Sequence, residues 1–128
     1  MSKYSVYNID EIESRQFDDE SVLEKEGFLE ISLVNENGRR ITIKFKDYIV
    51  YRKMDEGDAL ETLNKIASTS ELGHTLYLVE DSEFQDWFCR ESAGIHKKQR
   101  LLHFCLLSSN SVIDILAFSA PEAISELR

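Results

Sequence analysis

Three residues near the end of the chain have side chains that could act together in nucleophilic catalysis. His103, Cys105 and Asp114 lie in two apolar segments, residues 101–107 and 112–118, that read as the strands of a hairpin. If Leu107 pairs with Val112, Cys105 stands opposite Asp114, and His103 lies diagonally on the same face. An imidazole that lowers the pKa of a thiol, and a carboxylate that orients the imidazole, are what a cysteine nucleophile requires.

The spacing of these residues nevertheless disfavours catalysis. Side chains two apart on one strand point the same way but stand about 7 Å apart, so a hydrogen bond from Cys105 to His103 would require a bend. No helix N-terminus or glycine-rich turn is placed to form an oxyanion hole beside Cys105. We therefore expect a buried cysteine, a core histidine and no catalytic residues.

Metal and cofactor sites are not expected either. His74, His96 and His103 lack the spacing of three or four residues that pairs ligands on a helix, and Cys89 and Cys105 are not spaced as a metal-binding pair. The five glycines are scattered singly, without a phosphate-binding loop or a dinucleotide-binding fingerprint.

The clearest structural signal is residues 28–51, where two alternating segments flank a turn. A two-residue turn at Asn37-Gly38 would join the apolar face of one strand to the polar face of the other. A three-residue loop, residues 36–38, with Gly38 in the left-handed conformation, corrects this. It pairs Leu33 with Ile41 and places Glu30 opposite Lys44. A bend is expected at residue 47, where the alternation breaks.

The other segments predict the remaining elements. Residues 4–9 and 75–79 are typical of strands, and the acidic segment 10–26 reads as a loop or short surface helix with Ile12, Phe17, Val22 and Leu23 pointing inward. Helices are predicted after Asp55, after Asp81 or Ser82, and after Ser119 as a capping box. Together these elements predict one α+β domain over residues 1–128, with a mainly antiparallel sheet built from two hairpins and two main helices packed on one face.

Composition bounds the class of protein. With 42% hydrophobic and 30% charged residues, the chain is typical of a globular domain, and no apolar run is long enough to cross a bilayer. The net charge of −9 argues against nucleic acid or an anionic membrane as a partner. We expect a cytoplasmic protein with reduced thiols, and the charge favours a basic partner.

Charge is unevenly distributed along the sequence. Residues 39–53 contain six basic residues and one acid, whereas residues 55–91 contain ten acids and two basic residues. If both helices lie on one side of the sheet, their outer faces form one acidic surface. The candidate partner-binding residues of that surface are Asp55, Glu56, Asp58, Glu61, Asp81, Glu83 and Asp86.

Three stretches carry a family resemblance: YRKMDEG at residues 51–57, DSEFQDWF at 81–88 and HFCLLSSNSVIDIL at 103–116. They resemble blocks in small, acidic, largely uncharacterised proteins of Gram-positive bacteria, some of which are similar to immunity proteins encoded beside polymorphic toxins. The resemblance implies an α+β fold without catalytic residues. It also implies inhibition of a basic toxin domain, often a nuclease.

The sequence therefore predicts a non-enzymatic, immunity-type inhibitor that binds a basic protein through its acidic surface. Two alternatives stay open: an oligomeric scaffold or regulatory domain that associates through Trp87 or a sheet edge, and a small enzyme using Cys105, His103 and Asp114. The basic run from His96 to Arg100 suggests phosphate contact, an internal partner for the acidic segments, or a solvated turn.

Overall fold

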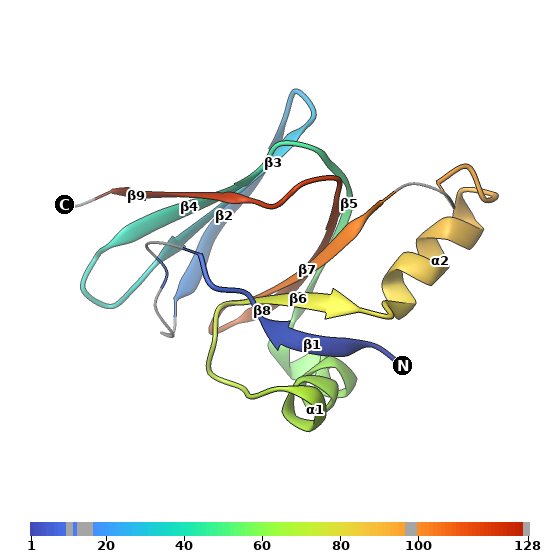
Figure 1. Ribbon diagram of the computed structural model, residues 1–128. Coiled ribbons are helices and arrows are strands. Elements are labelled where there is room, and N and C mark those ends of the chain that lie inside the picture. The colour runs from blue at the N-terminus through green and yellow to red at the C-terminus, as the bar shows by residue number, and fades with distance from the viewer. Residues whose placement is uncertain (10–11, 13–16, 97–99, 127–128) are drawn as a thin grey trace.

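The chain folds into two antiparallel sheets with two α-helices beside them, in a computed structural model that describes residues 1–9, 12, 17–96 and 100–126 (Figure 1). Sheet A has the order β1 (Lys3–Val6), β6 (Leu76–Glu80), β7 (Leu102–Leu107), β8 (Ser111–Ala117) and β5 (Tyr48–Asp55). Sheet B has the order β2 (Asp18–Lys25), β3 (Phe28–Val34), β4 (Arg40–Phe45) and β9 (Glu122–Glu126). The predicted α+β class is confirmed, but the two predicted hairpins belong to different sheets.

The β3–β4 hairpin has the predicted register. Leu33 pairs with Ile41 and Glu30 with Lys44. The loop closes through a 3.0 Å hydrogen bond from the Gly38 amide to the Asn35 carbonyl, and Gly38 has a φ of 79°. Alternation of apolar side chains thus fixes which face is buried, and the left-handed glycine supplies the loop that this register needs.

The predicted bend at residue 47 is where the chain passes from sheet B to sheet A. β4 ends at Phe45, and β5 pairs with β8 and not with β4. The Asp47 carbonyl accepts a 3.1 Å hydrogen bond from the amide of Phe118, just beyond β8. A register shift between Tyr48 and Val50 marks the irregular start of β5.

The main core lies between the sheets. Its fully buried members are Leu29, Ile31, Leu33, Ile41, Ile43 and Phe45 from sheet B and Phe104, Leu106, Ile113, Ile115 and Ala117 from sheet A. Burying a large apolar side chain contributes about 1.5–3 kcal/mol, so this layer dominates the stability of the fold. The opposite face of sheet A is also covered, because Ala59 and Ile66 pack there against Tyr77 and Cys105.

The two α-helices begin at different kinds of cap. Asp55, the predicted cap, accepts a 2.8 Å hydrogen bond from the Gly57 amide and so caps a short 3-10 turn, η1 (Glu56–Asp58); α1 (Leu60–Thr69) follows it. Ser82 caps α2 (Glu83–Glu91), since its Oγ accepts a 2.9 Å bond from the Gln85 amide.

The predicted last helix is wrong. Glu122–Glu126 instead forms β9, which pairs with β4 and places Ala123 opposite Ile43. Ser119 does not act as a helix cap; its Oγ donates a 2.9 Å hydrogen bond to the Asp47 carboxylate. A cap stabilises a helix by only about 1 kcal/mol, whereas the open edge of β4 offers a row of backbone hydrogen bonds.

The acidic segment was also assigned wrongly where the structure describes it. Residues 18–25 form β2 along the edge of β3, and residues 10, 11 and 13–16 lie outside the described part. Phe17 is buried, and Ile12 and Val22 pack against the core as predicted, but Leu23 is half exposed. Charged side chains suit an edge strand because they oppose pairing with another chain.

Candidate functional site

Four polar side chains from four elements form a continuous chain on the helix-covered side of sheet A. Ser82 Oγ lies 2.6 Å from His103 Nδ1, and His103 Nε2 lies 2.7 Å from Asp114 Oδ1. Arg52 Nε donates to the other Asp114 oxygen over 2.9 Å. Ser82, His103 and Asp114 are all at most 4% exposed.

Strand register brings these groups together. Arg52 of β5 stands directly opposite Asp114 of β8, and Cys105 stands opposite Asp114 on the other side, as predicted. His103, two residues before Cys105 on β7, reaches Asp114 diagonally. Ser82 arrives from the N-terminus of α2, which follows β6, the neighbour of β7.

The proton positions follow from the donors and acceptors. An ionised Asp114 can only accept, so His103 Nε2 carries the proton that it donates. In the neutral imidazole Nδ1 is then an acceptor, and the Ser82 hydroxyl donates to it while accepting from the Gln85 amide. Every polar group in this network has its partner.

Electrostatics keep the carboxylate ionised. Burial raises the pKa of Asp114, but the hydrogen bond from His103 and the hydrogen bond and charge of Arg52 lower it by more, so the net pKa lies below its ordinary value. Burial raises the pKa of the Cys105 thiol well above its ordinary value, and the nearby Asp114 charge adds to the increase. Cys105 is therefore a thiol, not a thiolate, near neutral pH.

The predicted alternative, a Cys105, His103 and Asp114 site, is brought together only in part. Asp114 contacts both of the other residues, but the second ring nitrogen of His103 is used by Ser82. Ser82, His103 and Asp114 are hydrogen-bonded in the same order as the catalytic triad of serine hydrolases. The Ser82 hydroxyl is buried, however, and it caps α2. This arrangement suits anchoring α2 to sheet A better than attacking a substrate.

Only the Arg52 end of the network reaches the surface. The guanidinium carbon lies 4.1 Å from the centre of the Phe84 ring, and Phe84 stacks on Trp87 with 5.7 Å between ring centres. Trp87 is 43% exposed, while Phe84 is buried against His103.

Sequence reasoning missed Ser82 and Arg52 as members of this hydrogen-bonded network, since both come from elements distant in the sequence.

The predicted partner-binding acids are all exposed. They lie at the end of β5, in η1, in the first turn of α1 and around the start of α2: Asp55, Glu56, Asp58, Glu61, Asp81, Glu83 and Asp86. Three of them pair with lysines. Lys65 binds both Glu61 and Glu83, and Lys3 lies 3.8 Å from Asp81.

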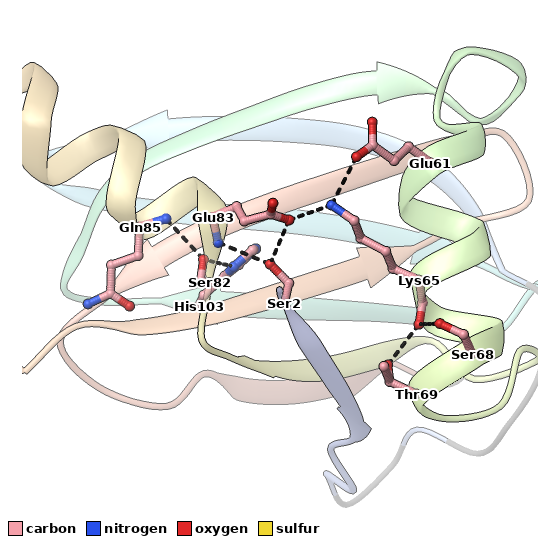
Figure 2. Close-up of polar contacts among 9 residues, drawn as sticks. All are labelled: Ser2, Glu61, Lys65, Ser68, Thr69, Ser82, Glu83, Gln85 and His103. Atoms are coloured by element: carbon pink, nitrogen blue, oxygen red, sulfur yellow. Dashed lines mark hydrogen bonds and ion pairs between the residues drawn. The ribbon is translucent and has the colours of Figure 1, made fainter.

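Lys65 connects the two helices, as Figure 2 shows. Its ammonium group lies between the carboxylates of Glu61 on α1 and Glu83 at the start of α2. Ser2 adds a third element, because its Oγ accepts a 3.0 Å hydrogen bond from the Glu83 amide (Figure 2). The hydrogen bond to Glu83 raises the pKa of Lys65 and lowers that of Glu83. Side chains from α1 and α2 thus meet at one cation.

Other predicted features are placed as follows. In the basic run, His96 stacks on Phe88 with 5.2 Å between ring centres, Arg100 is exposed, and residues 97–99 lie outside the described part. Among the described residues, no three His, Cys, Asp or Glu side chains gather as metal ligands. No helix in that same part of the chain has the length and apolar character needed to cross a bilayer.

The chain matches no family model, no curated protein and no solved structure.

Proposed function

We propose that the protein is a binding protein, not an enzyme, and that it inhibits a basic protein domain in the manner of a toxin immunity protein. Its binding surface, here called the acidic surface, consists of the seven acids at the helix starts: Asp55, Glu56, Asp58, Glu61, Asp81, Glu83 and Asp86. The observation that carries the proposal is the meeting of α1 and α2 at Lys65, which supports one surface shared by both helices.

The ion pairs within this surface involve only some of its acids. Lys3 and Lys65 pair with three of the seven acids: Asp81, Glu61 and Glu83. The side chains of Glu61 and Asp81 stay 85% and 67% exposed despite their ion pairs. Such exposed pairs are weak, about 0–1 kcal/mol, so a basic partner can compete for the carboxylates.

A concentrated negative surface favours rapid association with a positive one. Electrostatic steering raises association rates by about 10–1,000-fold, and the gain falls as salt screens the charges. An inhibitor that covers a basic active site uses this steering for both speed and selectivity. The buried Ser82 and Cys105 offer no accessible nucleophile, which supports binding over catalysis.

The test is recovery of a partner from native lysate by immobilised wild-type protein and by two charge variants. The first carries Asp58→Asn and Asp86→Asn in the acidic surface. The matched control carries Glu26→Gln and Glu36→Gln, which remove the same number of negative charges from exposed turns of sheet B.

We expect wild type and control to recover the same basic protein at low salt, with loss at high salt and in the Asp58 and Asp86 variant. The purified partner should then lose its activity when wild-type protein is added. Recovery of no basic protein, recovery insensitive to salt, or equal recovery by both variants would refute the proposal.

A further inference from the structure

One pocket of about 320 Å³ lies beside the acidic surface, between α1, the loop before β6 and the β7–β8 turn. Its walls are partly apolar and partly polar: Leu63, Leu72 and Leu107, with Glu56, Gly73, His74, Ser108 and Ser109. Sites for small ligands span about 300–1,000 Å³, so this volume suits one long side chain better than a nucleotide.

The walls of the pocket are held in place without a ligand. On one side, Tyr77 donates its hydroxyl hydrogen to the Glu71 carbonyl over 2.7 Å and accepts from the His74 amide over 3.2 Å. On the other side, Ser108 Oγ accepts from the Ser111 amide over 2.9 Å and so closes the β7–β8 turn. A preformed pocket avoids the cost of ordering its walls on binding.

Two side chains in the lining offer acceptor oxygens, Glu56 and Ser109. The Ser109 hydroxyl donates its hydrogen to Asp18, which leaves its lone pairs available, whereas Ser108 Oγ already accepts from the Ser111 and Asn110 amides. His74, which also lines the pocket, is hydrogen-bonded through Nε2 to the Glu71 carboxylate over 2.8 Å.

The charges around the pocket also favour a cationic group. Glu56 contributes a carboxylate to the lining, and Asp18 and Glu71 stand behind Ser109 and His74, while the Asp19 carboxylate behind Ser108 pairs with Lys53 at 3.3 Å. Leucine walls below acceptor groups fit a group with an apolar stem and a cationic, donor-rich end. Lysine and arginine side chains have this composition.

We propose that this pocket receives a lysine or arginine side chain of the basic partner, with the stem against Leu63, Leu72 and Leu107 and the cationic end at Glu56. The inference rests on the proposed function, because the basic partner supplies the side chain. It adds a specific anchor to an otherwise diffuse electrostatic surface, and a few such anchors carry most of the energy of an interface.

The pocket can be tested with small probes and the full chain. Amide chemical shifts are followed by NMR while n-hexylammonium, n-butylguanidinium, 1-hexanol or hexanoate is added. We expect the two cations to shift the Gly73 and Ser109 amides saturably, and the alcohol and the acid to bind at least about tenfold more weakly, since a charged hydrogen bond is lost.

Two variants, Glu56→Gln and Leu72→Ala, test the charge and the shape of the pocket separately, and Glu61→Gln is the control. Glu56→Gln should weaken n-hexylammonium binding by about tenfold or more, whereas Glu61→Gln, in the first turn of α1 and outside the pocket lining, should change it by less than about twofold. Leu72→Ala should weaken both cationic probes. Equal binding of alcohol and cation, shifts confined to other amides, or no effect of Glu56→Gln would overturn the proposal.

The outcome is distinguishable from failure of the proposed function. If Glu56→Gln and Leu72→Ala leave recovery of the basic partner unchanged while the Asp58 and Asp86 variant abolishes it, the pocket inference is wrong and the proposed function stands. If wild-type protein recovers no basic partner but the probes bind as expected, the pocket binds cations and the inhibitor proposal falls.

Discussion

Asp114→Ala tests the buried network most directly, since this carboxylate is fully buried and accepts hydrogen bonds from both His103 and Arg52. The substitution removes the acceptor for His103 Nε2 at 2.7 Å and for Arg52 Nε at 2.9 Å. His103 is 2% exposed and cannot regain its bond from water, whereas the half-exposed Arg52 can. The loss therefore falls mainly on the histidine side.

The expected cost is about 3–5 kcal/mol, because the buried His103 Nε2–H is left without an acceptor and the charge-assisted hydrogen bond to Arg52 is lost with it. Asp114→Asn should cost less, about 2 kcal/mol, because the amide oxygen can still accept from Arg52 and the amide hydrogens can donate to a His103 ring with its proton on Nδ1. A matched Asp86→Ala change on the exposed side of α2 should cost under about 1 kcal/mol.

Urea denaturation followed by circular dichroism at pH 7 measures all three variants. With a slope of about 2 kcal/mol per molar urea, a 4 kcal/mol loss moves the midpoint by about 2 M. A loss below about 1 kcal/mol for Asp114→Ala, or a loss for Asp114→Asn that equals or exceeds it, would refute the account of this network as a structural anchor.

Three further outcomes follow from the same geometry. In native protein iodoacetamide should modify Cys89 well before Cys105, whose thiol is buried with a raised pKa; equal rates, measured by mass spectrometry, would restore the cysteine enzyme hypothesis. Arg52→Gln should raise the pKa of Asp114. A lowered folded-state pKa gives stability that is present above the ordinary value of 3.8 and is lost as pH falls through the folded-state value, so acid unfolding of the variant should begin at higher pH in a circular dichroism titration. Gly38→Ala should lower the free energy of unfolding by about 1 kcal/mol in thermal unfolding, because φ is 79° at that position and a side chain strains this left-handed conformation. No atom lies within 4 Å of the added Cβ, so no clash adds to the cost, and no loss would mean that the loop relaxes.

Local patterns predicted the elements whose partners are near in the sequence. Alternation around Asn37-Gly38 and around the 108–111 turn was sufficient to fix two hairpin registers, because a shift of one residue would expose every buried side chain. The same register placed Cys105 opposite Asp114.

The same local patterns could not predict partners that are distant in the sequence. β9 pairs with a strand about 80 residues earlier, and only the open edge of β4 favours strand over helix at Glu122–Glu126. The contacts of His103 with Ser82, and of Asp114 with Arg52, also depend on which strands are neighbours. The signal available in the sequence was chemical: a buried aspartate beside a histidine requires further donors.

The alternation of the chain between the two layers bears on how the protein reaches its native state. β1 belongs to sheet A, the next three strands to sheet B, the following four to sheet A and the last to sheet B, so each layer takes in strands from both ends of the chain. Neither layer can finish assembling on its own early in synthesis, because the β1–β6, β5–β8 and β4–β9 pairings must wait for distant segments. Folding should accordingly be slow and cooperative, with amides in both layers exchanging their hydrogens in one shared opening event.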